Sequence, residues 1–402
     1  MSGALEGVRV LDLSRVLAGP WAAQNLADLG AEVVKVERPG AGDDTRGWGP
    51  PWLMDAAGRP TSESAYFLCA NRGKRSVTVD FTTPEGAELI RRLAADSHVL
   101  IENFKVGGLA KYGLDWPRLR EVNPRLVYCS ITGFGQDGPY RDRPGYDFMI
   151  QGMGGLMSVT GTEAEPMKAG VALCDVLTGM YATVAVLAAL RHAERTGEGQ
   201  RIDIALFDVQ VATLANQALN FLATGRNTRR WGNAHPNIVP YQAFATADGH
   251  VILAVGNDAQ FRRFCEVAGR PDMAADPRWR TNAARVGDRE ALTSLIAGLF
   301  LARPSAFWLR ELAAVGVPCG PINELSEVFD DPQARARGLR IDLPHAVAGT
   351  APGVASPMRL SATPVAYDRA PPTLGADTVE VLKARLALAE AEIERLRGSG
   401  IV

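Results

Sequence analysis

The chain has few cysteines and histidines, and neither type is arranged for a disulfide framework or a metal site. Five residues of each type are scattered over 402 positions, with no C-x-x-C pair and no H-E-x-x-H segment. An odd number of dispersed cysteines is typical of a reducing compartment, and zinc sites need closely and regularly spaced ligands. We therefore expect a cytoplasmic protein without a metal ion.

No charge sign and no apolar run dominates the sequence. Lys and Arg number 43 and Asp and Glu 45, a net charge of -2, which gives no general attraction to nucleic acid or to an anionic membrane. The longest uncharged runs contain Gly, Thr, Asn or Gln and fall short of the ~20 apolar residues that span a bilayer. The N-terminal residues MSGALEGVRVLDLS show no signal-peptide pattern. These absences favour a soluble enzyme.

Two common catalytic motifs are also missing. The first predicted strand-to-helix loop, residues 14–20, lacks G-x-G-x-x-G, so a nicotinamide dinucleotide is not indicated. No G-x-S-x-G nucleophile elbow exists, and no cysteine has a local histidine base. If catalysis includes a covalent step, a carboxylate is the best remaining nucleophile.

The sequence does contain a regular alternation of strands and helices. Strands are predicted at residues 8–13, 32–37, 76–81, 99–101, 126–131 and 201–205, and helices at 21–29, 84–95, 116–123, 176–194 and 207–224. Alternating apolar residues mark the strands, and apolar residues three or four positions apart mark the helices. The order predicts a mostly parallel, doubly wound sheet with ligands at the carboxyl ends of its strands.

The composition changes near residue 225, where Gly, Asn, Pro and Arg become frequent. A β-hairpin follows, with Asp248-Gly249 as its turn. We expect a large α/β domain at 1–224, a smaller α+β domain at 225–325, and a segment at 326–402 that returns to the large domain. That segment combines irregular extended chain around 351–364 with an amphipathic helix at 379–396.

Asp175 stands between an apolar approach and a long apolar helical run. In one interpretation it caps a helix that starts at Val176, accepting a hydrogen bond from a free backbone N–H. In the other, a carboxylate held at a helix N-terminus stays ionised and acts as a nucleophile. Both interpretations can hold at once.

Three basic elements accompany the first strands. Arg15 lies in the first loop, Arg38 follows the second strand, and a cluster spans residues 72–75. Such positions suit phosphate or a nucleotide ribose, although basic clusters are often only solvated surface. Residues 256–260, GNDAQ, form either a lid over an active site or a helix start capped by Asn257 or Asp258.

Several segments, in order and over essentially the whole length, resemble the family III CoA-transferases of the CaiB–BaiF group. They are LEGVRVLDLSRVLAGPWAAQNLADLGAEVVKVERPGAGDDTR, NRGKRSVTVDF, VLIENFKVGGLAKYGL, CSITGFGQDGPY, CDVLTGMYATVAVLAALRHAERTGEGQRIDIALFD and LGADTVEVL. The resemblance implies a Rossmann-like nucleotide-binding large domain built from both chain ends, an inserted smaller domain, and a homodimer of interlocked rings.

The resemblance also implies a mechanism. Asp175 matches the catalytic aspartate, which attacks an acyl-CoA thioester to form a mixed anhydride and then an aspartyl-CoA thioester. Backbone N–H groups of the helix after Asp175, or of the loop at Gly256, would stabilise the oxyanion.

Residues expected to bind coenzyme A, which is a substrate here, are Arg15, Val16, Ala18, Arg38, Arg72, Lys74, Arg75, Asn103, Phe104, Lys111 and Tyr146. Lys111 stands where some members have Arg, and Thr132 and Pro144 stand where some have Lys.

The segments RPGAGDDTRGWGPP and RRWGNAHPNIVPYQAF look most like those of succinate–hydroxymethylglutarate (glutarate) CoA-transferases. This likeness implies succinyl-CoA as donor and dicarboxylates as acceptors. The second carboxylate of such an acceptor, the one that does not react, would need a cation in the protein to bind it. The substrate and lid candidates are Arg46, Lys168, Arg230, His235, Gly256, Asn257 and Gln260.

Two rival functions remain open. Related racemases carry a histidine in a GHD motif, whereas this chain reads Gly145-Tyr146-Asp147, which disfavours racemisation or isomerisation of an acyl-CoA. A catalytically idle CoA-binding scaffold is the other, and the intact surroundings of Asp175 argue against it.

Overall fold

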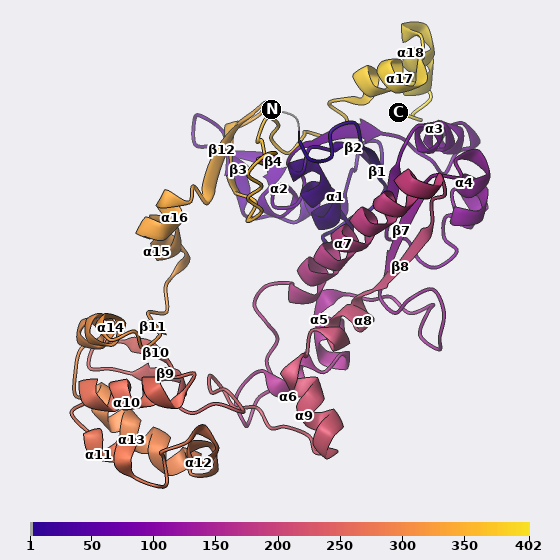
Figure 1. Ribbon diagram of the computed structural model, residues 1–402. Coiled ribbons are helices and arrows are strands. Elements are labelled where there is room, and N and C mark those ends of the chain that lie inside the picture. The colour runs from indigo at the N-terminus through magenta and orange to yellow at the C-terminus, as the bar shows by residue number, and fades with distance from the viewer. Residues whose placement is uncertain (1–2) are drawn as a thin grey trace. The chain divides into compact units, whose positions relative to one another are not determined.

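A computed structural model describes residues 3–402 of the chain (Figure 1). The chain divides into two compact units. The large unit comprises the residues up to Gly155, residues 169–214 and residues 332–402, and the small unit comprises residues 156–168 and 215–331. The chain thus passes between the two units four times.

The large unit is built on a six-stranded sheet in which every strand pair is parallel. Its strands, in spatial order, are β5 (Lys74–Thr78), β2 (Glu32–Glu37), β1 (Arg9–Asp12), β6 (Val99–Glu102), β7 (Val127–Thr132) and β8 (Arg201–Ala205). The predicted parallel, doubly wound sheet is therefore confirmed. The strand order reverses between β1 and β6, and in such sheets a ligand crevice opens beside the carboxyl ends at that point.

Helices cover both faces of this sheet. They are α1 (Ala18–Asp28), α3 (Pro84–Ala95), α4 (Trp116–Val122), α5 (Asp147–Met153), α7 (Leu173–Thr196), α8 (Leu206–Ala212), α17 (Thr378–Leu386) and α18 (Glu390–Gly398). Helix α7 packs directly on α1, because Gly179 has no side chain: a Cβ there would lie 2.7 Å from the carbonyl oxygen of Ala18. This close approach brings the start of α1 next to the first turns of α7.

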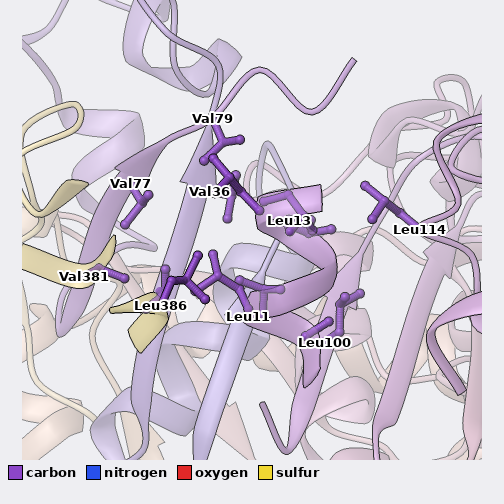
Figure 2. Close-up of a cluster of buried hydrophobic side chains, with 14 of the residues drawn as sticks. Leu11, Leu13, Val36, Val77, Val79, Leu100, Leu114, Val381 and Leu386 are labelled. Carbon is purple, nitrogen blue, oxygen red and sulfur yellow. The ribbon is translucent and has the colours of Figure 1, made fainter. Parts of the chain in front are cut away.

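Successive residues along each strand feed two separate hydrophobic cores. Val10 packs with α1 and α7, whereas Leu11 packs with α3 and the C-terminal helices. Figure 2 shows Val381 and Leu386 of α17 beside side chains of the first strands. The last residues of the chain are therefore part of the core of the large unit.

The small unit has its own core and a three-stranded antiparallel sheet. The sheet has the order β11 (Cys319–Gly320), β10 (His250–Ala254), β9 (Tyr241–Ala245), and its hairpin turns at the predicted Asp248-Gly249. The helices are α6 (Leu156–Val159), α9 (Asn216–Thr224), α10 (Asp258–Val267), α11 (Pro271–Ala275), α12 (Asn282–Gly287), α13 (Arg289–Leu301), α14 (Ser305–Ala314) and α15 (Leu325–Asp330). Stacked Phe300 and Trp308 rings, 4.2 Å apart, lie in its core.

Shorter elements complete the large unit. They are η1 (Asp44–Gly47), β3 (Trp52–Met54), β4 (Pro60–Ser64), α2 (Ala65–Leu68), η2 (Ala110–Tyr112), α16 (Pro332–Ala336), β12 (Arg340–His345) and β13 (Gly349–Val354). By length and composition alone α7 could cross a membrane, as could α13 and α14 if taken together. In the large unit, Cys174, Ala182 and Val186 of α7 are buried in the core against the sheet.

Three sequence predictions differ from the observed elements by more than a shift of their bounds. The helix predicted at 207–224 is two helices, α8 and α9, and the tail helix at 379–396 is also two, α17 and α18. Before each second helix a non-glycine residue takes a positive φ, Ala215 at 48° and Ala387 at 54°, and apolar periodicity does not reveal such a break. Residues 351–354, expected to be irregular, belong to the antiparallel strand β13, which pairs with β12.

Candidate active site

The loop between β1 and α1 is held from both sides. The N–H of Arg15 donates to Asn103 Oδ1 at 2.9 Å, and Asn103 Nδ2 donates to the Arg15 carbonyl at 2.7 Å. The N–H of Val16 donates to the carboxylate of Asp43 at 3.2 Å and 3.3 Å. Val16 has a φ of 72°, a strained conformation for a β-branched residue, and strain of this kind is concentrated at functional sites.

A buried ion pair supports this loop. Lys35 Nζ lies 2.9 Å from Asp43 Oδ2 and donates to the carbonyl of Ser14 at 2.9 Å, and both charged side chains are fully buried. Burial alone would raise the pKa of Asp43, but Lys35 and the hydrogen bonds from Thr45 lower it to about 2. Asp43 is therefore ionised at neutral pH and remains an acceptor for the loop.

A cavity of about 780 Å³ in the large unit lies at the switch point of the sheet. Nine of the predicted site residues line it together: Arg15, Val16, Ala18, Arg38, Asn103, Phe104, Lys111, Tyr146 and Asp175. Thr132 and Pro144 line the same cavity. The proposed nucleophile and the proposed coenzyme loop thus face one space, whose volume suits a nucleotide-sized ligand.

Asp175 is not the cap of its helix, so that prediction is wrong. Helix α7 begins at Leu173, which makes Asp175 its third residue. The acceptor comes instead from Asp147 at the start of α5: its Oδ1 accepts from the N–H of Cys174 at 2.8 Å and of Asp175 at 3.4 Å. An acceptor 28 residues away replaces the local cap that the sequence suggested.

The surroundings of Asp175 also change its acidity. Burial, and then the negative charge of Asp147, raise the pKa of Asp175 to about 7. The expectation that the helix N-terminus keeps this carboxylate fully ionised is therefore not met at neutral pH. Burial and the charge of Asp175 also raise the pKa of nearby Tyr66 to about 12, so its phenol keeps its proton.

Contrary to the prediction that it contacts coenzyme, Lys74 lies outside the lining of the cavity. Its side chain is fully buried, and Nζ donates at 2.9 Å to each of Asp12 Oδ2, Pro20 O and Asn71 Oδ1. The sequence suggested a strand starting at Ser76, but β5 starts at Lys74. This placement turns a supposed surface lysine into part of the sheet.

Arg72 and Arg75 lie outside the lining of the cavity and have other partners. Arg72 holds both oxygens of Asp28, at 2.8 Å and 2.6 Å. Arg75 Nη1 lies 2.7 Å from Glu380 Oε1 on α17. These arginines join the first strands to neighbouring elements of the large unit.

Arg46 is likewise engaged in the structure rather than exposed to a substrate. It makes a bidentate pair with Glu37, at 2.7 Å and 2.8 Å, and donates to Pro372 O at 3.0 Å. Its guanidinium lies 3.7 Å from the centre of the Phe67 ring. With 10% of the side chain exposed, Arg46 is a poor candidate for binding the second carboxylate of a dicarboxylate substrate.

The remaining substrate candidates belong to the small unit: Lys168, Arg230, His235, Gly256, Asn257 and Gln260. Asn257 accepts from the N–H of Gln260 at 2.9 Å, and Gln260 Oε1 accepts from the N–H of Gly256 at 2.7 Å. These bonds cap α10, as one of the two sequence interpretations had it. Whether any of these residues contacts a substrate remains a prediction.

Two arginines of the cavity lining escaped the sequence analysis. Arg141 and Arg143 both line it, and the guanidinium of Arg143 lies over the rings of Tyr140, at 4.7 Å, and Phe134, at 5.7 Å. The available signal was that Arg143 directly precedes Pro144, a position that the family resemblance had singled out. Asp147 was missed as well, because only the folded chain brings it to Asp175.

Known proteins match this chain over nearly its whole length. The sequence profile of CoA-transferase family III matches residues 5–378. The succinate–glutarate CoA-transferase of Agrobacterium fabrum is 54% identical over 379 residues, 94% of each chain. The human succinyl-CoA:glutarate CoA-transferase is 42% identical over 401 residues, 99% of this chain and 90% of the relative.

Solved structures agree with this assignment. A CaiB/BaiF family protein from Brucella suis is 50% identical and superposes with a TM-score of 0.84, over 96% of this chain and all of that one. A protein from Mycobacterium tuberculosis, 33% identical, gives a TM-score of 0.82 over 94% of this chain and 99% of its own. The chain therefore belongs to CoA-transferase family III, and it is a CoA-transferase.

Proposed function

We propose that this enzyme transfers coenzyme A from succinyl-CoA to a short dicarboxylic acid such as glutarate, with Asp175 as the nucleophile. The named activities of the relatives from Agrobacterium fabrum and human support the substrate pair. The observation that carries the proposal is that Asp175 and the loop 15–18 line one cavity of about 780 Å³.

The cavity offers cations and backbone donors for the phosphates of the coenzyme. Arg15, Arg38, Lys111 and Arg143 all line it. Helix α1 begins at Ala18, and within the described chain no side chain caps its first turn. Its free N–H groups and positive dipole end favour an anion there. The pyrophosphate would thus lie at the start of α1, with the pantetheine arm directed to Asp175.

In the proposed reaction, a carboxylate oxygen of Asp175 attacks the thioester carbon of succinyl-CoA. The C–S bond breaks, and an aspartyl-succinyl anhydride and CoA thiolate form. The thiolate then attacks the aspartyl carbonyl, which expels succinate and leaves an aspartyl-CoA thioester. Glutarate attacks that thioester, and the thiolate attacks the glutaryl carbonyl of the new anhydride. Glutaryl-CoA leaves, and the Asp175 carboxylate is restored.

The environment of Asp175 favours this chemistry for a definite reason. Burial and Asp147 disfavour the charged carboxylate and raise its pKa from 3.8 to about 7. An acylated aspartate is neutral, so the same two influences favour the anhydride and the thioester over the free carboxylate. The rise in the pKa of Asp175, from 3.8 to about 7, means that its charged form is destabilised by at most ~4 kcal/mol. A carboxylate, ordinarily a weak nucleophile, is thereby activated.

An isotope experiment tests the role of Asp175. Glutarate labelled with heavy oxygen transfers one labelled oxygen to the attacked aspartate in the proposed mechanism. After turnover and proteolysis, mass spectrometry should find that oxygen in the peptide containing Asp175, and the peptide containing Asp147 serves as the internal control. Active enzyme with an unlabelled Asp175, or with the label on Asp147, would contradict the proposal. Exchange of the α-proton with deuterated solvent without any acceptor acid would instead support a racemase.

We also propose a homodimer in the cytoplasm, as the family resemblance implies. Helix α7 exposes three large apolar side chains, Met180, Tyr181 and Val184, the last at 62%, and exposed apolar groups of this kind are typical of an interface. Light scattering on the purified chain should give twice the mass of one chain. A monomer at micromolar concentration would contradict this proposal.

A further inference from the structure

Glu102 is a buried carboxylate that the proposed reaction does not use. It is the last residue of β6 and only 5% exposed. Its Oε2 accepts from the N–H of Phe104 at 2.8 Å, and its Oε1 accepts from the hydroxyl of Ser130 on β7. Ser130 Oγ in turn accepts from Gln136 Nε2 at 2.8 Å. A continuous hydrogen-bonded chain thus ends on the backbone of a coenzyme-site residue.

The segment that Glu102 holds forms a wall between two cavities. Asn103 and Phe104 line the coenzyme cavity, whereas Glu102 and Ser130 line a second cavity of about 270 Å³ behind it. The residues common to both linings are Lys105, Val106 and Gly108. Asn103 is also hydrogen-bonded to both the N–H and the carbonyl of Arg15. A shift of the segment that contains Asn103 would therefore also move the loop that leads into α1.

Few charges compensate Glu102. Arg201 and Asp203 face it from β8, with opposite effects. Lys105 and Asp115 line the same second cavity, and Tyr128 on β7 keeps its proton because burial raises its pKa. Burial raises the pKa of Glu102 to about 7, although Ser130 and the N–H of Phe104 oppose the rise. The carboxylate therefore changes charge near neutral pH.

We propose that Glu102 is a positioning residue for the coenzyme, which holds the Asn103–Phe104 segment in its binding position through the backbone of Phe104. The inference rests on the proposed function, because it assumes that this cavity binds a CoA thioester. Ionised Glu102 makes a charge-assisted bond to the Phe104 N–H, and such bonds are about twice as strong as neutral ones. Coenzyme binding is accordingly tighter above pH 7 than below it.

The test measures binding of dephospho-CoA to the full-length chain by calorimetry, over a pH range of about 5.5 to 8.5. Dephospho-CoA lacks the 3′-phosphate, a monoester that itself titrates near pH 6. All variants carry Asp175→Asn, because Asp175 also titrates near neutrality. The compared variants are Glu102→Gln, Ser130→Ala and, as a matched control, Glu88→Gln, whose side chain pairs with Arg91 on the exposed face of α3.

With Glu102 intact, affinity should rise about fivefold between the two ends of the range, as expected when a bond becomes charge-assisted. Glu102→Gln should abolish this rise and keep the weaker affinity. Ser130→Ala, which leaves the charge in place, should move the inflection to higher pH, so the proposal stays testable even if Glu102→Gln does not fold. Glu88→Gln should behave like its parent.

An inflection that persists in Glu102→Gln, or one that Ser130→Ala leaves unmoved, would overturn the proposal. Failure of the unsubstituted enzyme to bind coenzyme at all would instead overturn the proposed function.

Discussion

Asp43, beneath the β1–α1 loop, has a pKa shifted in the opposite direction from those of Asp175 and Glu102. Asp43 has Lys35 at 2.9 Å, and its pKa falls to about 2. Burial raises the pKa of both Asp175 and Glu102 to about 7, and the like charge of Asp147 adds to the rise at Asp175. The difference is the presence of a buried cation. Paired carboxylates hold the loop in place, whereas those without such a cation are available for chemistry and for positioning.

Removing Lys35, the cation that pairs with Asp43 beneath the β1–α1 loop, should have the largest effect on stability. In Lys35→Met, Asp43 loses its partner, and a buried uncompensated charge costs about 3–5 kcal/mol. Urea unfolding at pH 7 should show that loss, and at pH 3 the loss should shrink, because Asp43 in the variant then binds a proton. A loss below about 1 kcal/mol would mean that the pair contributes little. Arg59→Met, which removes an exposed pair with Asp55, is the control.

Removing the charge of Asp175 should raise stability instead of lowering it. The folded pKa of Asp175, about 7, lies above its unfolded value of 3.8. The ionised side chain therefore costs stability, and this cost grows as pH rises from about 4 to 7. Asp175→Asn should be more stable than the parent at pH 8, by at most ~4 kcal/mol, and equal to it near pH 3. Thermal unfolding across that range checks the sign of the stability difference between Asp175→Asn and the parent. A variant that is less stable than the parent at pH 8 would contradict the raised pKa of Asp175.

Asp147 tests how much of that environment is like-charge repulsion. Asp147→Asn keeps an oxygen that can accept from Cys174 but removes the negative charge, so the pKa of Asp175 should fall below 7. The inflection in the pH profile of kcat should move to lower pH, and transfer at pH 8 should slow by about tenfold, the equivalent of one pKa step. If the inflection does not move, burial alone accounts for the raised pKa of Asp175. Asp147→Ala, which also loses the acceptor, should destabilise the start of α7 further.

Arg143 should give the smallest effect. Arg143→Ala removes one exposed cation from the cavity and should raise the KM for succinyl-CoA about fivefold, with kcat nearly unchanged, since an exposed ion pair contributes ~1 kcal/mol or less. Arg141→Ala is the matched comparison, because Arg141 lies 3.5 Å from Asp142. Equal KM values for the parent and both variants would remove these arginines from the binding site.

The sequence predicted what short-range signals determine. Helix α3 was placed at its observed bounds, because Thr83 caps it and Pro84 occupies its first position, and β2 and β8 were also placed at their observed bounds. The loop at Arg15 was recognised as a phosphate site from its place before a helix, and the family resemblance implied the pair Asn103–Phe104; both line one cavity with Asp175.

What the sequence did not predict depends on partners distant in the chain. Asp147 reaches Asp175 only through packing of α5 on α7, so neither the displaced helix start nor the raised pKa has a local signal. Arg46 and Lys74 appeared as free cations because no regular spacing links them to their partners, Glu37 nine residues earlier and Asp12 62 residues earlier. Charge in a sequence thus does not show whether a folded protein has already neutralised it.

The packing of the C-terminal helices on the first strands has a consequence for synthesis. The core on one face of the six-stranded sheet includes Val381, Leu386 and Ile401, so a nascent chain on the ribosome leaves part of that face uncovered until residues 378–402 have been translated. Such exposed apolar surface invites aggregation of incomplete chains. Termination of translation before residue 378 would therefore leave this apolar surface exposed, even though every residue that lines the cavity of about 780 Å³ had already been translated.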